Sequence, residues 1–267
     1  HPGDNKRRRR KDISPTMIPY FSGTGNTRLA ADRLARLTGD QAVPIDFDAA
    51  SMPLQGRRDR IVWCFPTYSW GPPPVVADFI SRVRLEAGGI PHFMLTTCGD
   101  DMAYTDRRWK RLIAARGWQA AGAFAVAMPN TYVLMKGFDV DSPETAAAKL
   151  AAMPAAMERI ADAIGSGDPD ILIRGSWPWV KSYVIYPWFV RHAMSPRPFH
   201  HTGACTGCGG CARSCPLGNI AMQPGGTPHW GNRCAMCLRC YHSCPRNAVA
   251  YGKATAGKGR YMAPKDI

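Results

Sequence analysis

The feature that most constrains this chain is a cysteine pattern, C-x2-C-x2-C-x3-C-P, that occurs twice near its C-terminal end. The first copy contains Cys205, Cys208, Cys211 and Cys215, and the second contains Cys234, Cys237, Cys240 and Cys244. Thiols at every third position let one tight loop supply three corners of a four-iron cluster, and the fourth corner needs a ligand from elsewhere. The doubled pattern predicts two 4Fe-4S clusters in a small repeated unit whose stability depends on bound metal.

Two structural zinc sites are the alternative for the same thiols. Zinc needs only two C-x-x-C pairs and has no use for a third cysteine at the same interval, so the pattern favours iron and sulfur. Nearby histidines such as His200 and His242 are expected at the surface or in packing, because eight thiolates already serve eight cluster corners. The basic stretch RRRRKDISPT is not followed by the apolar run of an export signal, which favours metal ligands over disulfides and a cytoplasmic location.

The chain is expected to have four parts. A length of 267 residues suits two domains. Residues 1–16 read as a flexible basic arm, and residues 17–168 alternate between short apolar runs and amphipathic stretches. Residues 169–198 are predicted to form an aromatic linker helix, and residues 199–267 the cluster domain with a C-terminal tail.

The alternation within residues 17–168 predicts strands at 17–21, 42–47, 60–65, 91–97 and 122–128. Amphipathic stretches at 26–39, 72–83 and 106–117 predict the helices between them. The last long helix is expected to begin after Ser142 as N-cap, with Pro143 at its first position, and Pro154 is expected to kink or split it. Strands and helices in this order indicate a doubly wound α/β fold, with a parallel sheet covered on both faces.

The stretch SGTGNT, Ser22 to Thr27, follows the first predicted strand and opens the first predicted helix. Its hydroxyl groups, a glycine that permits close backbone approach and the positive end of the helix together suit a phosphate. It lacks the Gly-Lys-Ser/Thr ending of nucleotide hydrolases and also lacks the pattern G-x-G-x-x-G. Taken alone, an ordinary turn between a strand and a helix is the alternative.

Further loops follow the other predicted strands. The stretch FPTYSWGPPP presents Tyr68 and Trp70, which either stack on a planar heterocycle or pack within their own domain. TTCGDD (residues 96–101) and MPNTY (residues 128–132) follow the fourth and fifth predicted strands. In an open sheet of order 2-1-3-4-5 such loops meet at the edge where ligands bind.

With these motifs, residues 17–165 resemble a flavodoxin and residues 199–251 resemble a bacterial two-cluster ferredoxin. The chain resembles the flavodoxin–ferredoxin fusion family, including FPTYSWGPP, AMPNTY and the closing GKGRY. The resemblance implies a flavodoxin-like five-stranded sheet, a small α+β ferredoxin-like domain, bound FMN and two 4Fe-4S clusters. The implied FMN-binding residues are Ser22, Gly23, Thr24, Gly25, Asn26, Thr27, Pro66, Thr67, Tyr68, Ser69, Trp70, Gly71, Thr97, Cys98, Gly99 and Asp100.

Crossed ligation is also implied, because in two-cluster ferredoxins the cysteine before proline binds the other cluster. One cluster then takes Cys205, Cys208, Cys211 and Cys244, and the other takes Cys234, Cys237, Cys240 and Cys215. Two cysteines are left over. Cys64 is expected in the core, and Cys98 is expected beside the flavin, either as a small loop residue or as a group that tunes the flavin.

The leading functional hypothesis is an electron carrier that passes electrons between FMN, the clusters and a redox partner. The alternative is an FMN-dependent oxidoreductase that acts directly on a small substrate and is fed by the cluster domain. No constellation of His, Asp and Glu near the flavin loops compels catalysis, and Asp100 and Asp101 are expected to cap the next helix.

The formal net charge of +14 stays positive after two clusters and a flavin phosphate are counted, which favours partners with an acidic docking surface or an anionic membrane. No nucleic-acid motif is present, so nucleic acid is not an expected partner. The stretch WPWVKSYVIYPWFVRHAM, residues 177–194, is aromatic and apolar, and Pro187 interrupts it. It is expected to pack between the two domains, and peripheral membrane contact is the alternative.

Overall fold

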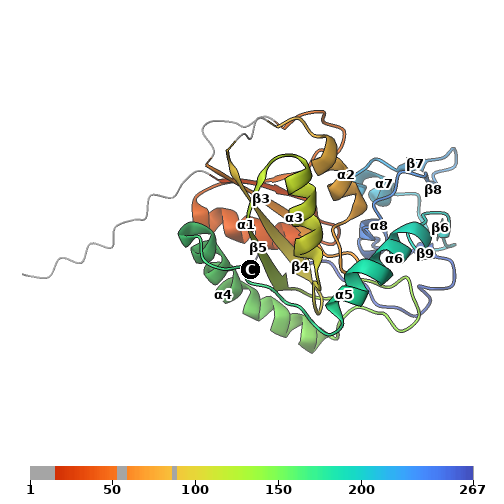
Figure 1. Ribbon diagram of the computed structural model, residues 1–267. Coiled ribbons are helices and arrows are strands. Elements are labelled where there is room, and N and C mark those ends of the chain that lie inside the picture. The colour runs from red at the N-terminus through yellow and green to blue at the C-terminus, as the bar shows by residue number, and fades with distance from the viewer. Residues whose placement is uncertain (1–15, 53–58, 86–88, 267) are drawn as a thin grey trace, which may run out of the picture.

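The computed structural model describes residues 16–52, 59–85 and 89–266, so all but the last residue of the expected basic arm lies outside the described residues. A five-stranded parallel sheet forms the centre of the larger part of the chain (Figure 1). Its strands are β1 (Thr16–Tyr20), β2 (Ala42–Pro44), β3 (Arg60–Pro66), β4 (Pro91–Cys98) and β5 (Gln119–Ala127), in the spatial order β2-β1-β3-β4-β5. This order confirms the expected doubly wound, flavodoxin-like arrangement.

Helices cover both faces of the sheet, because side chains along each strand alternate between the two faces. In β3, Val62 and Cys64 face helices α1 (Asn26–Thr38) and α4 (Pro143–Ser166). Ile61, Trp63 and Phe65 face helices α2 (Pro74–Arg82) and α3 (Thr105–Ala115) on the other side. All five side chains are fully buried, which confirms Cys64 as a core residue and explains the nearly continuous apolar run of this strand.

Helix α4 is continuous over 24 residues, so Pro154 does not split it. Ser142 caps its N-terminus as expected, since the hydroxyl of Ser142 accepts a hydrogen bond from the backbone N–H of Thr145 at 3.2 Å. Met153 and Met157 on its buried face pack against the sheet and α1. This packing outweighs the cost of a proline in a helix interior, about 3 kcal/mol.

The predicted linker helix is shorter than residues 169–198. Ile171 first forms a parallel bridge with Phe124 at the edge of the sheet. The helical part then runs through α5 (Pro178–Val180), one π-helical stretch η1 (Lys181–Ile185) and α6 (Tyr186–His192). The π turn ends two residues before Pro187, which has no N–H and would clash with a carbonyl in a regular α-helix.

The cysteine-rich part consists of two copies of one motif. In the first copy, β6 (Phe199–His201), α7 (Gly210–Ser214) and β7 (Ile220–Met222) follow one another, and in the second copy the equivalents are β8 (Pro228–Trp230), α8 (Arg239–His242) and β9 (Val249–Tyr251). The strands pair between copies, since β6 is antiparallel to β9 and β7 is antiparallel to β8. Left-handed backbone at Gly207, Gly209 and Gly218 recurs at the equivalent Met236, Leu238 and Asn247. The repeated fold imposes this conformation even where no glycine relieves its cost.

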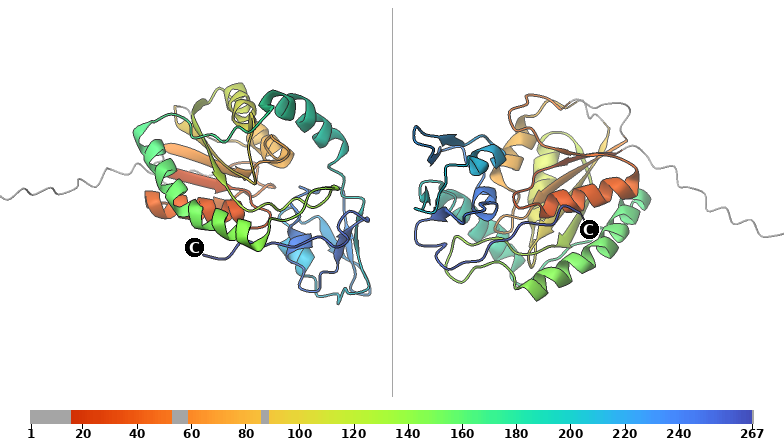
Figure 2. Two further views of the ribbon diagram at one scale, coloured as in Figure 1. Left: turned by 90° about the horizontal axis from the view of Figure 1, so that it is seen from below. Right: turned by 180° about the vertical axis from the view of Figure 1, so that it is seen from behind.

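The two parts of the chain pack directly on one another. Leu217 and Ala235 of the cysteine-rich part are buried in the same apolar cluster as Phe65 of the sheet. The C-terminal tail returns to the larger part, where the N–H of Ala263 donates to the carbonyl of Thr24 at 2.8 Å. Figure 2 shows the end of the chain beside α1 and α4. Among the described residues, no helix is both long enough and apolar enough to cross a membrane.

Candidate functional site

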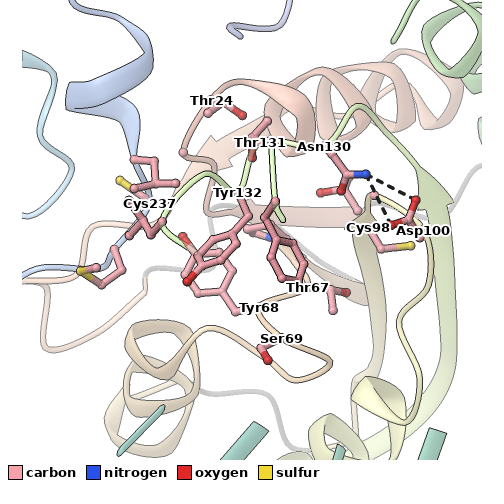
Figure 3. Close-up of a pocket in the computed structure, with 18 of the residues that line it drawn as sticks. Thr24, Thr67, Tyr68, Ser69, Cys98, Asp100, Asn130, Thr131, Tyr132 and Cys237 are labelled. Carbon is pink, nitrogen blue, oxygen red and sulfur yellow. Dashed lines mark hydrogen bonds between the residues drawn. The ribbon is translucent and has the colours of Figure 1, made fainter. Parts of the chain in front are cut away.

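A cavity of about 630 Å³ lies at the carboxyl edge of the parallel sheet. Its walls come from the loops that follow β1, β3, β4 and β5, from α6 and from the cysteine-rich part. Its size falls within the range of roughly 300–1,000 Å³ that is usual for small-molecule and cofactor sites. In Figure 3, Thr24, Thr67, Cys98 and Cys237 approach it from four different segments.

All of the residues implied to bind FMN line this cavity except Gly25 and Gly71. Gly25 lies under Ala263 of the C-terminal tail, and Gly71 lies so close to the ring of Tyr186 that a Cβ there would overlap it. These two glycines are therefore the points where the tail and α6 close against the loops of the sheet.

The loop Ser22–Thr27 is held from several sides. The N–H of Gly25 donates to Ser22 Oγ at 3.2 Å, and Thr27 Oγ1 lies 2.8 Å from Thr97 Oγ1. Gly25 has φ 103°, a conformation that suits glycine. The loop brings hydroxyl groups to the cavity at the positive end of α1, which is the chemistry of an anion site.

Asn26 of the same loop ties it to two distant segments. Its Nδ2 donates to the carbonyl of Pro129 at 2.9 Å, and its Oδ1 accepts from the hydroxyl of Tyr261 at 2.9 Å. The phosphate-type loop, the loop after β5 and the C-terminal tail are thus joined through one buried amide.

The loop after β3 presents the two expected aromatic side chains to the cavity. Tyr68 packs edge-on against Phe21, with ring centroids 6.4 Å apart. Burial raises the pKa of Tyr68 well above its usual value, and the nearby thiols of Cys237 and Cys234 act in the same direction. Lys181 Nζ lies 5.0 Å from the ring centroid of Trp70. Tyr68 and Trp70 therefore form an aromatic wall of the cavity. Contacts with Phe21 and Lys181 hold the two rings in place.

The loop after β4 places a protonated thiol beside two carboxylates. Burial raises the pKa of Cys98 to about 12, and the charges of Asp101 and Asp100 add to this effect. Asp101 forms an ion pair of 2.6 Å with Lys181 of η1. The expectation that these acids cap the next helix is wrong, because the N-cap of α3 is Tyr104 and Asp101 accepts instead from the N–H of Ala103.

The loop after β5 also reaches the cavity, as expected from its position at this edge of the sheet, since Asn130, Thr131 and Tyr132 all line it. Asn130 Nδ2 donates to Asp141 at 3.0 Å, and Lys149 bonds the same carboxylate at 2.6 Å. Burial alone raises the pKa of Asp141, but these hydrogen bonds outweigh it and the pKa is lowered.

Aromatic side chains close the cavity on the side of α6. The ring of Tyr132 lies 5.6 Å from that of Phe138 and 5.8 Å from that of Phe189, and both phenylalanines line the cavity. The aromatic composition of residues 177–194 is the sequence feature that could have indicated Phe189 and Trp188 as cavity residues. No sequence signal pointed to Cys237 as part of the same wall.

Two smaller cavities are each lined by four cysteines. One is lined by Cys205, Cys208, Cys211 and Cys244, and the other by Cys215, Cys234, Cys237 and Cys240. In each set the fourth cysteine comes from the other copy of the repeat, in the same grouping as the implied crossed ligation. Four thiols per site are the ligand type and number that one 4Fe-4S cluster takes. Within residues 16–52, 59–85 and 89–266, no three or more His, Cys, Asp or Glu side chains are grouped so as to hold a single metal ion.

The protein supports these thiols with backbone N–H groups. The N–H of Asn219 donates to Cys215 Sγ, and the N–H of the equivalent Ala248 donates to Cys244 Sγ, both at 3.3 Å. Such bonds stabilise thiolate ligands. Burial raises the pKa of Cys237 to about 12, so a metal that binds this thiolate must first displace its proton.

Cys237 lines both the large cavity and the second four-cysteine cavity. Gly23 lies directly against it, because a Cβ at Gly23 would overlap the carbonyl oxygen of Cys237. Arg239 holds the contact together, since its guanidinium donates to the carbonyls of Gly23 and Ser22 at 2.7 and 3.1 Å. The first four-cysteine cavity contains Cys208, which is exposed.

Comparisons with known proteins add structural neighbours of low similarity. No protein-family model matches the chain, and no curated protein matches it. A flavodoxin of Streptococcus pneumoniae is 15% identical, with 56% of this chain and 99% of that chain covered and a TM-score of 0.33. An NAD(P)H:quinone oxidoreductase of Methanothermobacter marburgensis is 10% identical, with 55% and 96% covered and a TM-score of 0.32. The Trp repressor binding protein of Bacillus subtilis is 12% identical, with 54% and 97% covered and a TM-score of 0.35.

Proposed function

We propose that this protein transfers electrons between FMN in the large cavity, two 4Fe-4S clusters in the cysteine-lined cavities and an external redox partner. The observation that carries the proposal is the position of Cys237, which lines the large cavity and also one of the four-cysteine cavities. A flavin and a cluster held by these residues would share one wall, which would bring them close enough to exchange electrons.

The residues of the large cavity suit FMN at both of its ends. The hydroxyls of Ser22 and Thr24 and the positive end of α1 would hold the phosphate, with the guanidinium of Arg239 beside the loop. Trp70 and Tyr132 supply aromatic surface for the ring. When bound, FMN supplies chemistry that can exchange either one or two electrons.

The cysteine positions give the centres an order. The set with Cys237 adjoins the flavin cavity, whereas the set with Cys208 reaches the surface. When bound, 4Fe-4S clusters supply one-electron chemistry. Arg246 lines the outer cavity and Arg213 lies beside Gly209 of the same cavity. Both are exposed, and their charge suits a partner with an acidic docking surface.

Anaerobic isolation with iron, sulfide and flavin assays, followed by a visible and EPR redox titration, tests the proposal. We expect about eight irons and one flavin per chain. Zinc in place of iron, or clusters without flavin, would contradict it. A matched pair of variants tests the order of the centres: Cys237→Ser should change the fluorescence of bound flavin, whereas Cys208→Ser should change it less.

A second function is favoured by one observation. Met135 and Phe138 line the large cavity and are still 37% and 48% exposed, so the cavity opens to solvent beside apolar side chains. This opening suits direct reduction of a small apolar substrate by the flavin, fed by the clusters. Turnover of quinones by the reduced protein without any partner protein would favour this function over that of a carrier.

A further inference from the structure

We propose that the outward face of the helical segment 177–192, together with neighbouring arginines of α3, binds the surface of an anionic lipid membrane. The segment lies along the larger part of the chain, next to the loops that surround the cavity (Figures 1 and 2). The inference does not depend on FMN or the clusters, because all of the side chains that carry it except Trp188 lie outside their cavities.

The outward face carries large apolar side chains that no other part of the described chain covers. Trp177 is 77% exposed, Trp179 is 59% exposed and Val184 is 51% exposed. Exposed apolar side chains scattered singly are ordinary, whereas a group of them on one short segment marks a binding surface. Trp188, 53% exposed, extends the group to the edge of the flavin cavity, which it also lines.

The inward face of the same segment is fixed, so the exposure of the outward face is not a result of loose packing. The hydroxyl of the fully buried Ser182 accepts from the N–H of Tyr104 and donates to the carbonyl of Trp70, both at 2.9 Å. The hydroxyl of Tyr186 donates to the carbonyl of Pro72 at 2.6 Å. The segment is therefore held in one orientation, with Trp177 and Trp179 exposed to solvent.

Exposed arginines of α3 adjoin these tryptophans through a chain of aromatic contacts. The guanidinium of Arg111 lies 5.3 Å from the ring centroid of Tyr183, and the ring of Tyr183 lies 6.0 Å from that of Trp179. The guanidinium of Arg107 lies 3.8 Å from the ring centroid of Tyr104, which itself contacts Tyr183. Both arginines are exposed, and Arg191 is exposed at the other end of the segment.

Two acids near this face do not cancel its charge. Asp101 is paired with Lys181 at 2.6 Å, and Asp106 is paired with Arg174. The side chains of both acids are less than 10% exposed. The face therefore presents tryptophan and arginine together, which is the composition of segments that lie at the level of lipid headgroups.

Charge selects the lipid surface over a second copy of the chain. Two copies joined face to face would bring Arg107 and Arg111 of each copy near the same groups of the other, which is unfavourable. An anionic bilayer offers negative headgroups for the arginines and an apolar layer for the tryptophans. No helix of the described chain needs to cross the bilayer for this contact.

Vesicle sedimentation of the full chain at low salt tests the proposal, with vesicles of phosphatidylcholine alone and of phosphatidylcholine mixed with phosphatidylglycerol. We expect binding to the mixed vesicles and little to the neutral ones. The variant Trp177→Ser/Trp179→Ser/Val184→Ser should bind at least about tenfold more weakly. The variant Arg107→Gln/Arg111→Gln should lose about tenfold in binding to mixed vesicles, because each basic residue near such a surface adds to the attraction.

Two control variants remove exposed apolar or basic side chains elsewhere on the surface. Met222→Ser/Met262→Ser alters exposed apolar side chains of the cysteine-rich part and tail, and Arg36→Gln/Arg159→Gln alters exposed arginines on α1 and α4. Both should bind as the unchanged chain does. Brominated lipid quenches the fluorescence of tryptophans that insert into the bilayer. This measurement therefore distinguishes insertion from the attraction of anionic lipid to the basic residues at positions 6–11.

Three results would overturn the proposal. The first is absence of binding to the mixed vesicles. The second is equal binding and equal brominated-lipid quenching in the Trp177→Ser/Trp179→Ser/Val184→Ser variant. The third is a dimer that becomes monomeric in this variant, with no vesicle binding in either form, which would assign the face to a second copy of the chain.

Discussion

Gly23 of the loop after β1 lies in direct backbone contact with Cys237 of the cysteine-rich part, with no room for a Cβ between them. The contact joins residues far apart in the sequence, and it brings the candidate flavin cavity against one of the two candidate cluster cavities. A glycine of the phosphate-type loop therefore also determines how closely the two parts of the chain approach.

The first prediction concerns this contact. Gly23→Ala should lower the free energy of unfolding by about 1–3 kcal/mol, because the added methyl group would overlap the carbonyl of Cys237. Urea denaturation measures the change. Gly165→Ala is the matched control, since Gly165 lies within α4 with open space around it and should gain roughly 0.5–1 kcal/mol. Equal stability of the two variants would show that the parts do not meet at Gly23.

The second prediction concerns Arg239, which bonds the carbonyls of Ser22 and Gly23. Arg239→Gln should weaken FMN binding by about tenfold, because it removes charge-assisted hydrogen bonds that fix the loop and a positive charge beside the expected phosphate. Fluorescence titration of the apoprotein with FMN gives the dissociation constant. Arg246→Gln makes the same change in net charge at an exposed position and should leave that constant unaltered.

The third prediction concerns the crossed grouping of the cysteines. Cys215→Ser should give an EPR spectrum that resembles that of Cys234→Ser, because these two thiols line the same cavity. Cys244→Ser should instead resemble Cys205→Ser. A Cys215→Ser spectrum that matched Cys205→Ser would mean that each repeat binds its own cluster.

The fourth prediction concerns Ser182, whose buried hydroxyl joins η1 to two loops of the cavity. Ser182→Ala should lower the free energy of unfolding by about 1–3 kcal/mol, because the N–H of Tyr104 and the carbonyl of Trp70 both lose a partner. Ser81→Ala is the control, since the exposed Ser81 hydroxyl bonds only the nearby carbonyl of Asp78. That change should stay within about 0.5 kcal/mol, and a similar loss in both variants would contradict the role of Ser182.

The fifth prediction is a dependence of stability on pH. His92 is fully buried, accepts a hydrogen bond at Nδ1 from the indole N–H of Trp63 at 2.9 Å, and stacks on Trp118. Burial, with the charge of Arg116 as a smaller cause, lowers the pKa of His92 from 6.5 to about 4. The folded protein therefore keeps His92 neutral where the unfolded chain is already protonated.

It follows that the contribution of His92 to stability is complete above pH 6.5 and is lost as the pH falls toward about 4. The loss should reach up to about 3 kcal/mol. His92→Gln keeps a hydrogen-bond acceptor for Trp63 but cannot gain a proton, so its free energy of unfolding should change less over this range. Parallel pH profiles for the variant and the unchanged chain would falsify this assignment.

Much of the fold was predictable because most local patterns in this sequence indicate one type of secondary structure. Apolar runs of strand length that alternate with amphipathic helices indicate a parallel sheet, and the observed order β2-β1-β3-β4-β5 agrees with it. Pro154 is an instance where a local rule was overridden, since the packing of Met153 and Met157 keeps α4 in one piece. The role of Asp101 was not predictable, because its partner Lys181 is 80 residues away.

The sequence by itself determined the doubled cysteine pattern, the phosphate-type loop and the α/β order, because these depend on spacing and local backbone preference. Only the tertiary structure decided that Cys237 adjoins the loop of Gly23, that Arg239 and Tyr261 close this loop, and that the tryptophans at 177 and 179 face outward. These relationships depend on contacts between segments that are distant along the chain. Such contacts form only when both segments have already folded and packed, so no local pattern records them.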